Sequence, residues 1–201
     1  MIFRKARDGR GAKWAPRLVG SSFADAGFCG ASANSGLFRF HDAISGAIGQ
    51  EFMDETFVRD GMQAHVFAYD WLGRQFAVSS NLSETGERSS QERTVVVFSP
   101  FDMSITPLMH VDQFMDTLGL EMMVDFLQVD LFRAWRQKHG IDSLDLSHCA
   151  GTTVPAYCNG SLQLSNLTYD DMDVYLTFCS QTWNQMKRHP PGSAPPKLVC
   201  K

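Results

Sequence analysis

Two groups of side chains in the C-terminal third of the chain are of types that bind metal ions. His148, Cys149 and Cys158 offer imidazole and thiol ligands, but their spacing matches no zinc motif, and a fourth ligand would have to be distant. Asp170, Asp171 and Asp173 offer carboxylates for a divalent cation, but the ligand and glycine pattern of an EF-hand is missing. Ordinary loop and core residues are the simpler interpretation of both groups.

The sequence contains residue types that serve in nucleophilic catalysis, but no pattern places a nucleophile beside a base. The chain has 5 cysteines and 6 histidines, and nothing in the sequence pairs one thiol with one base. The patterns GxxxxGK[ST], GxGxxG, GxSxG and HExxH do not occur. We therefore expect no enzyme, cofactor or metal site, with a small metal-dependent hydrolase as the alternative. The cysteines are odd in number and widely spaced, and no CxxC pair occurs. This pattern indicates reduced thiols and a cytoplasmic location.

The net charge of −4 conceals an asymmetry along the chain. Residues 1–20 contain six lysines and arginines and one aspartate, so they carry +6 − 1 = +5, and the remainder carries about −9. Residues 94–132 and 140–186 contain acidic residues but no lysine or arginine. Such tracts repel nucleic acid and attract basic partners, although solvated faces that maintain solubility are an equally simple interpretation. The basic arm leaves a nucleic-acid-binding protein open as a further alternative.

The length of 201 residues and the 44% hydrophobic content suit one globular domain. No apolar run approaches the ~18–20 residues that span a membrane. The basic N-terminus has no apolar segment behind it, so we predict neither a membrane partner nor a secretory signal. We divide the chain into an irregular basic segment, 1–35, and a domain, 36–201.

The element that must organise this domain is a predicted β-hairpin with strands at 65–69 and 74–79. The turn between them contains a tryptophan, Trp71, which is unusual because turns are normally polar. We expect this indole to fold back and fill the core, and we expect Asp70 and Arg74 to pair across the turn. The residues predicted to be structural are Tyr69, Asp70, Trp71, Gly73, Arg74 and Phe76.

Hydrophobic periodicity predicts the remaining elements. Strands are expected at 36–41, 94–99 and 104–108, and helices at 43–52, 111–118 and 120–139. Residues 80–92 and 140–160 are expected to be loops, 162–167 a strand, and 198–199 a last short strand. For 172–188 we favour a short strand at 172–176 and a helix at 178–188, with one long helix as the alternative. The predicted fold class is α+β, a single globular domain with a central, mostly antiparallel sheet and helices packed on it.

The hairpin sequence 67–77 (FAYDWLGRQFA) resembles the characteristic segment of a bacterial family, the C-terminal domain of type VI secretion immunity proteins that neutralise DNase effectors. Weaker matches occur in the expected order over roughly 36–200. They are 36–41 (GLFRFH), Val154-Pro155, Asn166-Leu167, 171–175 (DMDVY) followed by Gln181, and 190–192 (PPG). A GAD-like domain often precedes this domain in the family, and residues 1–35 are short for one, so a remnant of it is one interpretation.

This resemblance implies an α+β domain without catalytic activity that neutralises a cognate nuclease toxin by tight binding. The expected complex is a cytoplasmic 1:1 heterodimer in which an acidic surface covers the basic active or DNA-binding surface of the toxin. No catalytic residue, cofactor, nucleic acid or membrane is expected as part of this function. The residues predicted to contact the toxin are Asp112, Asp116, Glu121, Asp170, Asp171 and Asp173.

Overall fold

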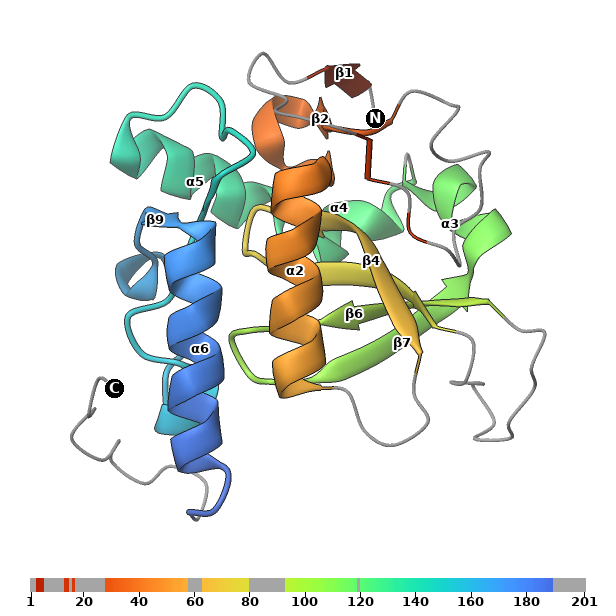
Figure 1. Ribbon diagram of the computed structural model, residues 1–201. Helices are drawn as coiled ribbons and strands as arrows, with labels where there is room; N and C mark the ends of the chain where they lie inside the picture. Colours follow the sequence, from red (N-terminus) through yellow and green to blue (C-terminus); the bar gives the residue numbers. More distant parts are fainter. Residues whose placement is uncertain are drawn as a thin grey trace.

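A seven-stranded antiparallel sheet forms the middle layer of the computed structural model (Figure 1). Each strand pairs with the next along the chain. The structure describes residues 3–5, 13–14, 16, 28–57, 63–79, 93–118 and 120–189. The strands are β1 (Phe3–Lys5), β2 (Ala31–Ala33), β3 (Phe38–Phe40), β4 (Ala64–Asp70), β5 (Gln75–Ser79), β6 (Thr94–Phe98) and β7 (Ile105–His110).

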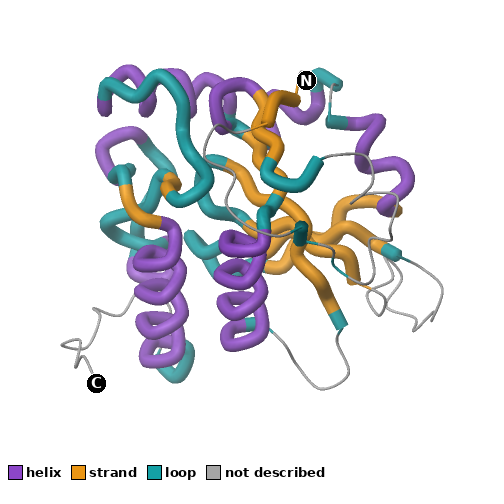
Figure 2. The backbone as a smooth tube through the Cα atoms, turned by 45° about the horizontal axis from the view of Figure 1, so that its top comes forward, coloured by secondary structure: helices purple, strands orange, loops and turns teal. Residues whose placement is uncertain are grey.

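Helices cover both faces of this sheet. Helices α2 (Ala43–Thr56) and α6 (Met172–Met186) lie on one face. Helices α3 (Val111–Thr117), α4 (Met122–Phe126) and α5 (Val129–His139) lie on the other. A two-stranded sheet of β8 (His148–Cys149) and β9 (Asp170–Asp171) and three 3₁₀ turns, η1 (Asn34–Gly36), η2 (Ala156–Cys158) and η3 (Leu164–Asn166), complete the described elements. Figure 2 shows α2 and α6 side by side.

Strands β3 to β6 are buried on both faces, because their side chains alternate between two layers and helices cover both. Phe76, Val78, Val95 and Val97 pack in the cluster that includes α3, α4 and α5. Ala77, Val96 and Phe98 pack in the cluster that includes α2 and α6. The predicted α+β class, with helices on an antiparallel sheet, is confirmed. Among the described residues no helix is both long enough and apolar enough to cross a membrane.

The predicted single helix at 120–139 is wrong, because two helices occupy this stretch. The backbone leaves the helical conformation at Gln128, which has a φ of 54°. Side chains of the hairpin turn bond the carbonyls just before this break: the indole Nε1 of Trp71 donates to Leu127 O, and Arg74 donates to Phe126 O. The break therefore depends on tertiary hydrogen bonds, which a helical pattern in the sequence cannot reveal.

Two predicted strands in the C-terminal third are also wrong. Residues 172–176 are the first turns of α6, as the alternative interpretation proposed, because Asp171 accepts a hydrogen bond from Val174 N and caps the helix. Residues 162–167 contain η3 and only an isolated bridge from Leu167 to Thr152. There the Asn166 side chain takes the place of strand pairing, since it bonds both the N–H and the carbonyl of Val154.

The N-terminal segment is not irregular throughout, as we predicted it to be. Strands β1 and β2 both lie within residues 1–35 and add to the β3 edge of the main sheet. Residues 31–33 (ASA) are too short and too small to show a strand pattern in the sequence, so only their pairing with β3 reveals them. The predicted loop at 80–92, the predicted strand at 198–199 and the motif at 190–192 lie outside the described residues.

Candidate functional site

The β4–β5 turn is a buried structural element. Trp71 and Asp70 are fully buried, and Asp70 accepts hydrogen bonds from the N–H groups of Leu72 and Arg74. The guanidinium of Arg74 lies 2.6 Å from the Asp70 carboxylate, which is the predicted pairing across the turn. Gly73 supplies the positive φ of 74° that closes the turn. None of these side chains offers an exposed reactive group.

A second buried polar group lies beneath α2. The guanidinium of Arg39 stacks on Tyr69 and donates hydrogen bonds to the carbonyls of Asp70, Asp145 and His148. His41 bonds Gln75 and Ser45 through its two ring nitrogens. Burial lowers the pKa of His41 to about 3, so this imidazole is neutral at physiological pH. These bonds join the strands to the loop after α5 and leave no reactive group at the surface.

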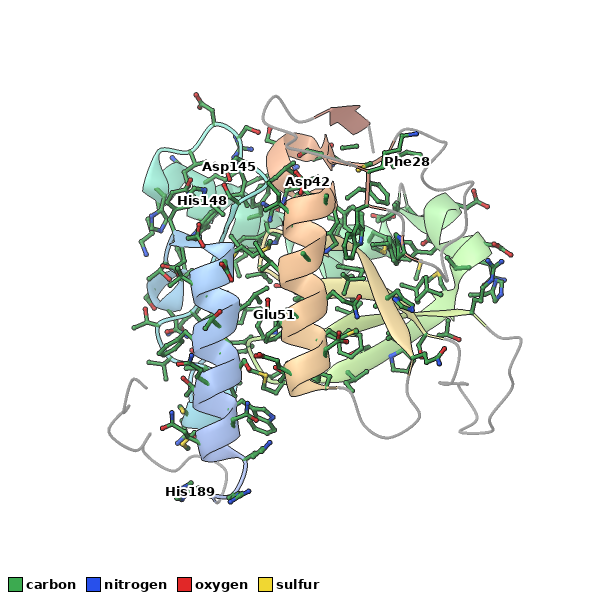
Figure 3. The ribbon with its side chains drawn as sticks, viewed as in Figure 1. Phe28, Asp42, Glu51, Asp145, His148 and His189 are labelled. Carbon is green, nitrogen blue, oxygen red and sulfur yellow. The ribbon has the colours of Figure 1, made fainter. Side chains whose placement is uncertain are left out.

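The residues considered as zinc ligands or nucleophiles do not converge. His148 Nδ1 lies 2.8 Å from Asp145 Oδ1 (Figure 3). The His148 ring also stacks on Tyr169. Burial alone raises the pKa of Asp145, but hydrogen bonds from His148 and Ser147 outweigh it and hold this pKa below its ordinary value. Burial raises the pKa of the Cys149 thiol well above its usual range, and the thiol is therefore protonated and unreactive.

The three aspartates near residue 170 have separate surroundings. Asp170 accepts a hydrogen bond from the Thr168 hydroxyl, Asp171 caps α6, and Asp173 is exposed on the first turn of that helix. Among the described residues, no three His, Cys, Asp or Glu side chains lie close enough together to hold a metal ion.

The six carboxylates predicted to contact a toxin do not form one surface. Asp112 and Asp116 lie on α3 and Glu121 precedes α4, in the layer on one face of the sheet. Asp170, Asp171 and Asp173 lie at the start of α6, in the opposite layer. Asp112 is also within 3.5 Å of the Arg93 guanidinium, which compensates part of its charge.

Tertiary packing instead builds an acidic surface from α2 and α6, which we call the α2–α6 face. The two helices run side by side in the same direction (Figures 1 and 2). The hydroxyl of Ser180 on α6 donates a hydrogen bond to Glu55 on α2, so these two residues lie on the sides of the helices that face each other. Glu51 lies one turn before Glu55, and Asp173 lies two turns before Ser180, so these carboxylates flank the same seam.

Neither helix of this face contains a lysine or an arginine. The two helices carry four exposed carboxylates, Glu51, Asp54, Glu55 and Asp173, and Asp54 accepts a hydrogen bond from Gln50 on its own helix. The same helices also carry exposed apolar side chains, namely Ile44 on α2 and, four residues apart on α6, Val174 and Phe178. The predicted contact residues do not include the α2 acids, although the absence of lysine and arginine from residues 43–57 is a signal for them.

Comparison with known proteins gives a fold and no family. No family model matches this chain, and no curated protein matches it either. Atu4351 from Agrobacterium tumefaciens has a similar crystal structure, with a TM-score of 0.58 and 10% sequence identity. The match covers 89% of this chain and 85% of that chain. At this identity the likeness supports the α+β fold alone.

Proposed function

We propose that this protein is an immunity protein that binds a nuclease toxin of a type VI secretion system in a 1:1 complex and blocks its DNA-binding or catalytic surface. Support comes from the resemblance of the hairpin sequence to that family and from the α2–α6 face. The acidic pair of helices is the single observation that carries the proposal. It is exposed, it has one sign of charge, and it is built by two helices that pack on the core.

The charge of this face suits a nuclease partner. An enzyme that binds the phosphate backbone needs a basic surface, and an acidic protein surface is complementary to it. Opposite charges accelerate the encounter of the two proteins, and this acceleration falls as the salt concentration rises. The same charge repels DNA, so the protein is expected to compete with DNA and not to bind it.

Apolar side chains on the face suit a tight complex. Charge alone gives a fast encounter, but the slow dissociation of an inhibitor needs apolar side chains that become buried. Val174 and Phe178 lie on adjacent turns of α6 and provide such a pair next to Asp173. The α2–α6 face therefore combines exposed apolar side chains with carboxylates.

Co-expression with the product of the adjacent gene tests the function. We expect cells that produce both proteins to survive, a 1:1 complex to co-purify, and the complex to have no DNase activity. Cell death without a complex that co-purifies would refute the proposed function.

The surface is tested by association kinetics of purified proteins. The triple change Glu51→Gln, Glu55→Gln and Asp173→Asn removes three charges from the α2–α6 face. We expect it to slow association at low salt by roughly tenfold or more. The matched control removes three exposed charges from the opposite layer, by Asp112→Asn, Asp116→Asn and Asp130→Asn, and leaves the rate nearly unchanged. The reverse result would place the interface on α3 and α5.

A further inference from the structure

A second exposed surface lies on the opposite layer, around the single-turn helix α4. Three apolar side chains at Leu120, Met122 and Val124 are 52%, 58% and 44% exposed. Glu121 and Asp125 are exposed as well. Because Glu121 and Asp125 are four residues apart, they lie on one ridge of the turn, with Met122 on one side and Val124 on the other. We call residues 120–125 the α4 surface.

The hairpin turn holds this surface in place. On the inner side of α4, Met123 and Leu127 are buried in the core. Trp71 Nε1 donates to Leu127 O at 2.8 Å, and Arg74 donates to Phe126 O at 2.8 Å. The Arg74 guanidinium also lies 4.6 Å from the centre of the Phe126 ring. The exposed side chains of α4 are therefore presented on a backbone that is already ordered, which lowers the entropic cost of binding.

The charges around the α4 surface limit what can cover it. The chain contains no lysine or arginine between Arg93 and Arg133, so no nearby residue in sequence neutralises Glu121 and Asp125. Nucleic acid and anionic membranes are repelled by such a surface. A second copy of the chain would place the same carboxylates against each other, at a cost in free energy. A protein segment with cationic side chains next to apolar ones complements both features.

We propose that the α4 surface is a second protein-binding site, and that it binds an amphipathic basic segment of a partner protein. The apolar side chains of that segment contact Leu120, Met122 and Val124, and its lysines or arginines pair with Glu121 and Asp125. This site lies on the other face of the sheet from the α2–α6 face. The inference therefore does not rest on the proposed function, and a single rigid surface of a partner cannot cover both faces.

The test uses a fluorescein-labelled helical peptide of leucine and lysine with one apolar face, titrated with the full chain at low salt. A scrambled peptide of the same composition lacks the apolar face and serves as the peptide control. We expect saturable binding of the first peptide and at least tenfold weaker binding of the second. Amide resonances that shift on titration should lie within residues 120–125 and not in α6. Absence of binding, or equal binding of both peptides, would overturn the proposal.

Two pairs of substitutions separate the α4 surface from general attraction to an acidic protein. Met122→Ser with Glu121→Gln should weaken the peptide at least tenfold, and both positions are exposed, so the fold is retained. Val174→Ser with Asp173→Asn is the matched pair on α6, and it should leave peptide binding unchanged. Equal weakening by both pairs would refute a specific site. Self-association of the chain that Met122→Ser abolishes would show that a second copy covers α4, which also overturns the proposal.

Discussion

Replacement of Trp71 by Phe tests whether the hairpin turn is a structural element that positions α4. The indole is fully buried, packs against Phe132 and Trp135 at ring distances of 5.2 and 5.6 Å, and donates to Leu127 O at 2.8 Å. Phenylalanine keeps an aromatic ring but loses the N–H donor. A turn residue reserved for catalysis or binding would tolerate this change without loss of stability.

The magnitude follows from these contacts. The Leu127 carbonyl loses the indole donor, and a buried polar group without its partner costs about 1–3 kcal/mol. The smaller ring adds about 1 kcal/mol of lost apolar burial. We expect Trp71→Phe to lower the free energy of unfolding by about 2–4 kcal/mol, out of a total of roughly 5–15 kcal/mol. Urea unfolding followed by circular dichroism should show this as a lower midpoint with an unchanged slope.

The control is Trp183→Phe, which changes a half-buried tryptophan on α6 and should cost under about 1 kcal/mol. Hydrogen exchange adds a local measurement, because amides of residues 123–128 should exchange faster in Trp71→Phe than in the parent protein. A stability loss below about 0.5 kcal/mol with unchanged exchange would refute the structural role of Trp71.

Three further predictions concern the buried polar groups and the glycines. Asp70→Asn leaves the Arg74 guanidinium without its carboxylate and should cost about 2–4 kcal/mol, and a double-mutant cycle with Arg74→Met should show a coupling energy well above zero. Burial lowers the pKa of His41 from 6.5 to about 3, so the unfolded chain binds its proton first as the pH falls. Stability should therefore drop between about pH 6.5 and pH 3, by up to about 4–5 kcal/mol from this group, and pH-dependent unfolding of His41→Gln should lack this part of the slope. Gly36→Ala places a methyl group 2.6 Å from a backbone carbonyl at a φ of +94°, whereas the methyl group of Gly140→Ala meets nothing within 4 Å. Thermal unfolding should therefore show a clearly larger loss of stability for Gly36→Ala than the ~1 kcal/mol expected for Gly140→Ala.

The sequence predicted the hairpin well because its signals are local. Alternating apolar residues mark both strands, and the turn residues Asp70 and Gly73 favour the conformation observed. The start of α6 was less well predicted, although its capping residue is also local. There Asp171 was considered as a metal or partner ligand, and its contact with Val174 N shows that it caps the helix.

The candidate site was only partly visible in the sequence. Asp173 was among the predicted contact residues, but Glu51 and Glu55 were not, since they are more than a hundred residues away along the chain. Packing of α2 and α6 in one apolar cluster brings them together, and the Ser180–Glu55 hydrogen bond joins the two helices. The predicted contact residues of α3, Asp112 and Asp116, lie in the opposite layer.

The sequence by itself determined the α+β class, the central hairpin with its buried tryptophan and the excess of negative charge outside the first 20 residues. These properties depend on hydrophobic period, turn residues and composition, which are local or additive. Only the tertiary structure decided which carboxylates share a surface, because that depends on which helices pack side by side. It also decided where the helix after Gly119 breaks, since Trp71 and Arg74 bond carbonyls more than fifty residues away. The turn that marks the family resemblance is therefore buried, and the surfaces proposed to bind partners are on the helices of the two outer layers.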